Sequence, residues 1–69
     1  MDKRQLSNQI KVFRAKNNLT QEGLAFKVDV TRKTINTIEN GIFVPSVILA
    51  IKLARVFDIP VEELFHLEQ

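Results

Sequence analysis

Apolar residues recur along the chain with the period of an amphipathic helix. Leu6, Ile10 and Phe13 follow the i, i+4, i+7 spacing and predict a first helix at about residues 4–16. The same kind of spacing predicts two further helices, whose buried faces would carry Leu24, Ala25, Val28, Ile35 and Ile38.

Residues that commonly begin or end helices separate these segments. Ser and Thr cap a helix by accepting a hydrogen bond from a backbone N–H of its first turn, while Asn and Gly tolerate the left-handed backbone at its end. The sequence therefore predicts helix starts at Thr20, Thr31 and Ser46, and helix ends at Asn17-Asn18 and Gly41. A fourth helix would run from Ser46 to about Phe57, and Pro60 would take the first position of a short fifth helix through Leu64 and Phe65. Five helices and no convincing strand predict an all-α, compact five-helix bundle that forms a single domain over residues 1–69.

The segment between Gln21 and Asn40 is the most informative. Its apolar spacing, with the small Ala25 near the crossing point, suits two short helices that cross steeply through a turn of about three to four residues. Several stretches of the chain carry a resemblance to a known protein family: Leu19-Thr20-Gln21, Leu24-Ala25, Thr31 through Ile35, Ile38-Glu39-Asn40-Gly41, Pro45-Ser46 and Glu62-Glu63-Leu64-Phe65. In these stretches the chain resembles the lambda-repressor-like, Cro-type helix-turn-helix family, also called the xenobiotic-response-element family. The resemblance implies a DNA-binding transcriptional regulator whose second and third helices form the motif at about residues 20–40.

The third helix has one polar side that could read DNA. At ~100° per residue, Arg32, Lys33, Asn36 and Thr37 share an arc that lies away from Ile35 and Ile38. In a major groove Arg32 could grip guanine, and Lys33 could reach guanine or phosphate. Asn36 could pair with adenine, and the Thr37 methyl could touch thymine. The alternative is a solvated helix face without a partner.

The resemblance also implies roles for residues beside this face. Gln21 would contact a DNA phosphate and brace Arg32, and the alternative is an uninvolved residue at a helix start. Thr31 and Asn40 would contact phosphate or position the helix. Arg14 and Glu39 would form a structural pair, with Arg14 also able to approach a phosphate. Asp29 stands where the family usually has Gly, so positive φ is expected there.

Composition and charge narrow the function further. The chain has 69 residues, no Cys and one His, so we expect no disulfide, metal or cofactor. It has no Gly-rich phosphate loop and no paired catalytic groups, so we do not expect an enzyme or a small-molecule ligand. The net charge of +2 divides into a basic half up to residue 33 and an acidic half after it, which suits a polyanion such as double-stranded DNA. Without a long apolar run or a signal-like start, the expected location is cytoplasmic, with no membrane partner.

The fourth helix is apolar on nearly every side. Val47, Ala50, Leu53 or Ala54, and Phe57 would suffice for the core, so the surplus predicts a homodimer. The interface would draw on Ile48, Ile51, Phe43 and Leu67. Such a dimer would be a repressor that binds a near-palindromic operator. Two alternatives remain: isolated exposed apolar residues, or a protein-interaction module, such as an antitoxin or bridging factor, that uses an apolar surface at residues 42–51. Phe26 has no assigned role.

Overall fold

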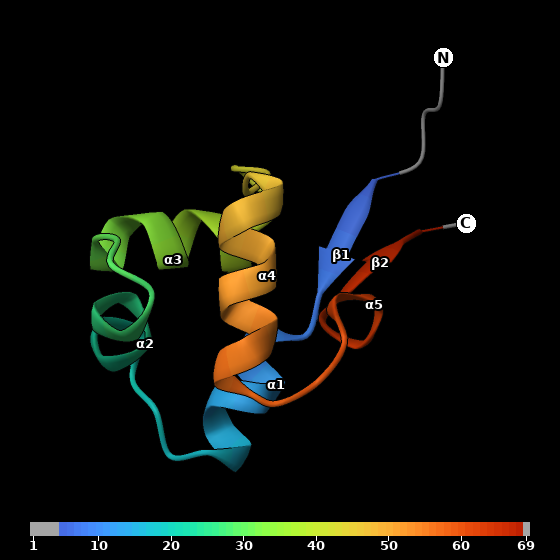
Figure 1. The fold of residues 1–69 in the computed structure, drawn as a ribbon. Helices are drawn as coiled ribbons and strands as arrows, with labels where there is room; N and C mark the ends of the chain where they lie inside the picture. Colours follow the sequence, from blue (N-terminus) through green and yellow to red (C-terminus); the bar gives the residue numbers. More distant parts are fainter. Residues whose placement is uncertain (1–4, 69) are drawn as a thin grey trace.

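The computed structural model describes residues 5–68 and has five helices and two short strands in this range (Figure 1). The elements in chain order are β1 (Leu6–Asn8), α1 (Ile10–Lys16), α2 (Gln21–Lys27), α3 (Arg32–Glu39), α4 (Val47–Val56), α5 (Val61–Leu64) and β2 (Phe65–Leu67). The prediction of a small five-helix bundle is therefore confirmed. Figure 1 shows α2 and α3 on one side of α4, and the strands with α5 on the other.

The prediction that the chain has no strand was wrong. Instead of starting a helix, Leu6–Asn8 pairs antiparallel with Phe65–Leu67, so that Leu6 faces Leu67 and Asn8 faces Phe65. The first helix begins only at Ile10, and residue 4 lies outside the described residues. Phe65 belongs to β2 rather than to α5. Pairing between segments about 60 residues apart in sequence supplies the hydrogen bonds and burial, and a local helical period cannot reveal it.

The helix boundaries in the rest of the chain follow the predicted caps. The side chains of Thr20, Thr31 and Ser46 accept hydrogen bonds from the backbone N–H groups three residues later. Gly41, which follows the C-cap of α3, has φ of 74°, and Asn18, which follows the C-cap of α1, has φ of 55°. Pro60 is the N-cap of α5 rather than its first residue, which shifts that boundary by one position.

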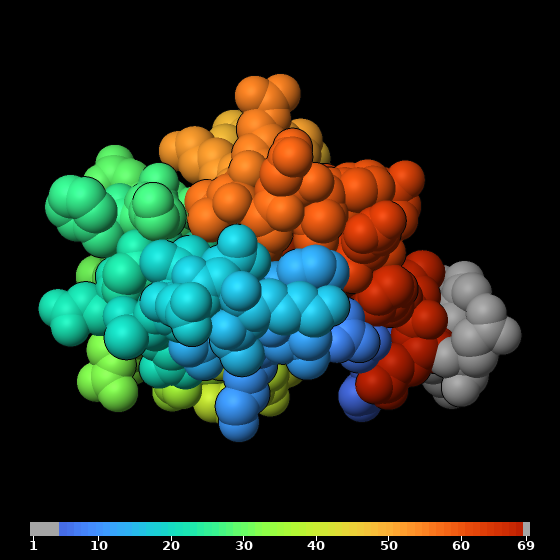
Figure 2. All heavy atoms as spheres, turned by 90° about the horizontal axis from the view of Figure 1, so that it is seen from below, coloured from blue at the N-terminus to red at the C-terminus, as the bar shows by residue number. Residues whose placement is uncertain are grey.

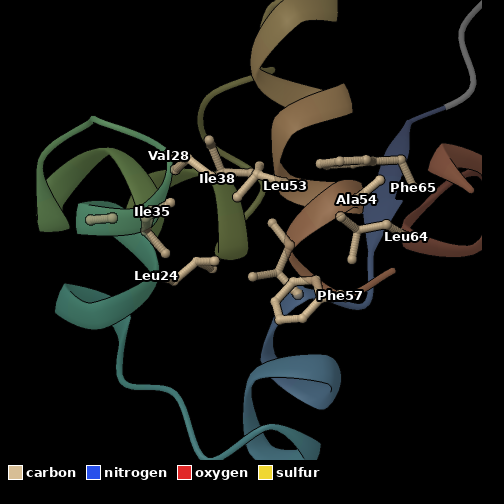
Figure 3. Close-up of a cluster of buried hydrophobic side chains, with 11 residues drawn as sticks. Leu24, Val28, Ile35, Ile38, Leu53, Ala54, Phe57, Leu64 and Phe65 are labelled. Atoms are coloured by element: carbon tan, nitrogen blue, oxygen red, sulfur yellow. The ribbon is translucent and has the colours of Figure 1, made fainter. Parts of the chain in front are cut away.

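The core lies where α1, α2, α3, α4, α5 and β2 meet. The buried side chains in Figure 3 extend from Leu24 and Ile35 on the α2–α3 side, past Leu53 of α4, to Leu64 and Phe65. Seen from below, α1 and the loop that follows it lie between α2 and the α4–β2 side of the molecule (Figure 2). This packing holds α3 against the bundle by its apolar side and leaves its polar side to solvent.

One expected core residue of α4 is not buried. Val47 is 75% exposed, whereas Leu53 and Ala54 are buried and Ala50 is partly buried. Val47 lies in the first turn of α4, directly after the loop, where the bundle no longer covers the inner side of the helix.

Candidate nucleic-acid interface

The α2–turn–α3 unit fixes the direction of α3. Asp29 takes the left-handed conformation expected of it, with φ of 62°, and the Val30 N–H returns to the Ala25 carbonyl at 3.0 Å. Thr31 then begins α3: its Oγ1 accepts from the Thr34 N–H at 3.3 Å and lies 3.1 Å from the Thr34 hydroxyl. These contacts explain why the third helix starts at Arg32.

The outer side of α3 is polar and open to solvent. Arg32, Lys33 and Asn36 are exposed and line a shallow hollow of about 290 Å³. Thr37 is partly buried, and its hydroxyl donates to the carbonyls of Lys33 and Thr34 at 3.0 and 2.9 Å. The structure therefore places these four predicted residues on one side of α3, opposite the buried Ile35 and Ile38.

Arg14 of α1 and Glu39 of α3 meet beside this surface. Arg14 Nε lies 2.6 Å from Glu39 Oε2, and Nη2 lies 3.1 Å from Oε1. Arg14 Nη1 also donates to the Leu19 carbonyl at 3.0 Å. The hydrogen bond to Glu39 raises the pKa of Arg14, the negative charge of Glu39 adds to this, and burial opposes it. The guanidinium therefore stays charged throughout the neutral range, and the stabilisation that it gives would be lost only in strong alkali.

A chain of side-chain amides continues from Glu39 to the exposed side of α3. Gln21 Nε2 donates to Glu39 Oε1 and to Asn36 Oδ1, both at 3.2 Å. Asn40 Nδ2 donates to Asn36 Oδ1 at 3.2 Å and to the Asn36 carbonyl at 2.9 Å. In residues 5–68 the Gln21 amide donates to Asn36 and Glu39, and the bracing of Arg32 by Gln21 stays a prediction. We call Arg14, Glu39, Gln21, Asn36 and Asn40 the polar network.

The sequence did not indicate a link between β1 and the end of α3. Asn8 Nδ2 donates to the Ile38 carbonyl at 3.0 Å, and Asn8 Oδ1 accepts from the Ile10 N–H at 3.2 Å. Asn8 thus connects the strand ribbon to α3 and accepts a hydrogen bond from the first backbone N–H of α1. The only local signal is an Asn two residues before a helix, which is too common to identify such a link.

A second surface follows α3 directly. Six large apolar side chains between residues 42 and 51 are 40% to 77% exposed, and we call them the apolar surface: Ile42, Phe43, Val44, Val47, Ile48 and Ile51. The backbone N–H groups of Ile42 and Phe43 bond the Thr37 carbonyl, which holds the loop against the end of α3. Phe43 and Val44 also line a groove of about 450 Å³ beside the strand ribbon, together with Leu67, which is 52% exposed.

The remaining features add few candidate sites. Residues 5–68 contain no group of three or more His, Cys, Asp or Glu side chains placed to hold a metal ion. None of the described helices is long and apolar enough to span a membrane. Phe26 projects from α2 and is 86% exposed.

Comparison with known proteins agrees with this geometry. A helix-turn-helix family model, of the lambda-repressor-like Cro/C1 type, matches residues 10–64. An uncharacterised HTH-type transcriptional regulator of Methanocaldococcus jannaschii is 46% identical over 63 residues, which cover 91% of this chain and 96% of that protein. The uncharacterised HTH-type transcriptional regulator YgzD of Bacillus subtilis is 41% identical over 64 residues, which cover 93% of this chain and 97% of that protein.

Solved structures show the same fold. The restriction-modification controller protein C.AhdI from Aeromonas hydrophila is 31% identical and matches with a TM-score of 0.74 over 80% of this chain and 83% of its own. The crystal structure of a protein from Bacteroides fragilis matches with a TM-score of 0.79 over 88% of this chain and 98% of its own. Its sequence identity is 24%, so this match supports the fold alone. The predicted lambda-repressor-like architecture is thereby confirmed.

Proposed function

Because the chain belongs to the lambda-repressor-like helix-turn-helix family, we propose that it is a sequence-specific regulator of transcription that reads double-stranded DNA with α3. The name of the M. jannaschii relative supports the regulatory role. We further propose that it acts as a homodimeric repressor in the cytoplasm, and that it is not an enzyme.

The observation that carries this proposal is the polar side of α3. Arg32, Lys33 and Asn36 are exposed together, while Ile35 and Ile38 fix the opposite side in the core. An α-helix fits the major groove of DNA, where Arg and Lys pair with guanine and Asn can contact a purine edge. The Thr37 hydroxyl is already bonded within α3, which suits a role for its methyl group at thymine.

Neighbouring residues would set the position of α3 on the DNA. Thr31 stands at the start of α3, where its hydroxyl could approach a phosphate. Arg14 uses three of its five N–H groups inside the protein, so it mainly orients α3 and can offer the others to phosphate. Both hydrogens of the Gln21 and Asn40 amides are engaged within the protein, which favours a positioning role for these two residues.

The apolar surface supports the homodimer. Ile48, Ile51 and Phe43 are exposed, and Leu67 lines the same groove as Phe43. Large side chains left in water at neighbouring positions commonly mark an interface. A two-fold axis through this surface would set two copies of α3 about 34 Å apart, which is one turn of DNA, and would require a near-palindromic operator.

The same surface favours a second candidate function. A protein-interaction module, such as an antitoxin or a bridging factor, would cover residues 42–51 with a different protein. The mass in solution separates the two candidates, because a clean dimer supports the operator-binding regulator and a monomer supports a missing partner.

The test is selection of bound duplexes from a random pool, followed by titration at several salt concentrations. We expect one near-palindromic site and an affinity that falls with salt at a log-log slope of ~0.9 for each phosphate neutralised. A chain that enriches no site over random DNA would disprove the proposed function.

A further inference from the structure

The polar network determines which end of the Asn36 amide faces outward. Glu39 is bonded to Arg14, and its carboxylate can only accept hydrogen bonds. The Gln21 atom beside it must therefore be the NH2 group. That same NH2 group also reaches Asn36 at 3.2 Å, so the facing atom of Asn36 must be its oxygen.

The other end of the network leads to the same orientation. The backbone carbonyl of Asn36 can only accept, and the Asn40 amide lies 2.9 Å from it, so the NH2 group of Asn40 must point there. This NH2 group is also 3.2 Å from the Asn36 side-chain oxygen. Two donors, Gln21 from α2 and Asn40 from the end of α3, thus reach Asn36 Oδ1.

The NH2 group of Asn36 is consequently the end available to a ligand. It has no acceptor among residues 5–68, and Asn36 shares the solvent-exposed hollow on α3 with Arg32 and Lys33. A bidentate contact with adenine needs Asn36 both to donate to N7 and to accept from the N6 amino group. Guanine instead presents two acceptors, N7 and O6, to the major groove.

We propose that Asn36 reads DNA as a hydrogen-bond donor only and selects guanine over adenine at its position. Gln21 and Asn40 are positioning residues that impose this choice by occupying the Asn36 oxygen. The inference rests on the proposed function, and it replaces the contact with adenine that the sequence alone suggested.

The test uses two variants of Asn36 in the selection of bound duplexes. Asn36→Ala locates the base pair that Asn36 reads, since only that position should lose its preference. Asn36→Asp keeps an oxygen that accepts from Gln21 and Asn40 but removes the outward donors. We expect both variants to lower the affinity for the selected site about tenfold, and Asn36→Asp to lose the guanine preference although the network is kept.

Base analogues at that position provide a second test, in which the affinity of the wild-type protein is measured. Replacing guanine by 7-deazaguanine removes the N7 acceptor and should weaken binding, whereas inosine keeps N7 and O6 and should bind as guanine does. The inference would be overturned if the protein selected adenine at that position and its binding required the N6 amino group of this adenine. An unchanged site preference in Asn36→Ala would overturn it as well, and in both cases the proposed function would stand.

The free protein provides a control that needs no DNA. The side-chain amide hydrogens of Asn36 should exchange with water faster than those of Gln21 and Asn40, as measured by NMR. The reverse order would overturn the inference. Failure of the wild-type chain to select any duplex would instead overturn the proposed function, and this inference with it.

Discussion

The polar network ends at Asn40 and the apolar surface begins at Ile42, yet the two regions are built on opposite principles. Each member of the network has a directed partner, with Glu39 held by Arg14 and Asn36 held by two amides. The apolar surface has large side chains in water, such as Ile42 at 77% and Ile48 at 70% exposure. One region is therefore organised before any partner arrives, and the other gains its stabilisation only from a partner.

This difference indicates what each region can contribute. Oriented donors and acceptors discriminate between partners because a wrong partner leaves polar groups unpaired. Apolar surface contributes affinity in proportion to the area removed from water, with little directional selectivity. We therefore expect substitutions in the network to change folding and sequence preference, and substitutions in the apolar surface to change association.

The largest effect is expected from Glu39→Ala, which leaves the Arg14 guanidinium without its partner. Glu39 and Arg14 are only 7% and 14% exposed, and removing one side of such a pair costs about 3–5 kcal/mol. The free energy of unfolding of a domain of this size is about as large in total, so most molecules of the variant should be unfolded in buffer. Urea unfolding followed by circular dichroism measures this. Glu68→Ala, at an exposed carboxylate, is the control and should stay near wild type.

The apolar surface can be tested by placing a charge in it. Ile48→Lys should weaken the dimer at least tenfold, since burial of such a side chain contributes about 1.5–3 kcal/mol, and folding should be unaffected. Sedimentation equilibrium gives the dissociation constant. Phe26→Lys makes a similar change at an exposed apolar residue on α2, away from this surface, and should leave the dimer intact. Equal dissociation in both variants would contradict an interface at residues 42–51.

Local sequence signals predicted the helices but not the strands. Thr20, Thr31 and Ser46 act through hydrogen bonds within three residues, so their identity sufficed to predict the caps. Leu6 lies at a helical spacing from Ile10, and only its pairing with Leu67 shows that it belongs to a strand. Periodicity cannot foresee such long-range pairing.

The exposed surface of the candidate site and the Arg14–Glu39 pair could be predicted, whereas the amide hydrogen bonds of the polar network could not. The helical period of α3 put Arg32 and Asn36 on one side, as the structure has them. It could not give the rotation of a side-chain amide, which depends on a residue of another helix. The pairing of Gln21 with Arg32 was implied by the family resemblance, and the structure adds that the Gln21 amide bonds Asn36 and Glu39.

Arg32→Ala should affect DNA recognition without affecting either folding or association. Loss of a bidentate contact with guanine costs about 1–3 kcal/mol and relaxes the preference at one base pair. Selection and fluorescence titration with the enriched site and its single-base variants measure both effects. Arg55→Ala removes the same charge from the exposed side of α4 and should lower affinity less, with no change in preference. Equal loss on every sequence for Arg32→Ala would restrict Arg32 to phosphate contact.

The smallest effect comes from the two caps that begin the helices of these regions. Thr31 starts α3 and Ser46 starts α4, and each side chain accepts one backbone N–H, from Thr34 and Leu49. Replacing either by Ala should cost about 1 kcal/mol in unfolding free energy, because the capped N–H loses its partner. The two variants should differ in function: Thr31→Ala lowers DNA affinity at equal dimer strength, whereas Ser46→Ala weakens dimerisation at equal site preference. Identical profiles would mean that the two regions do not act separately.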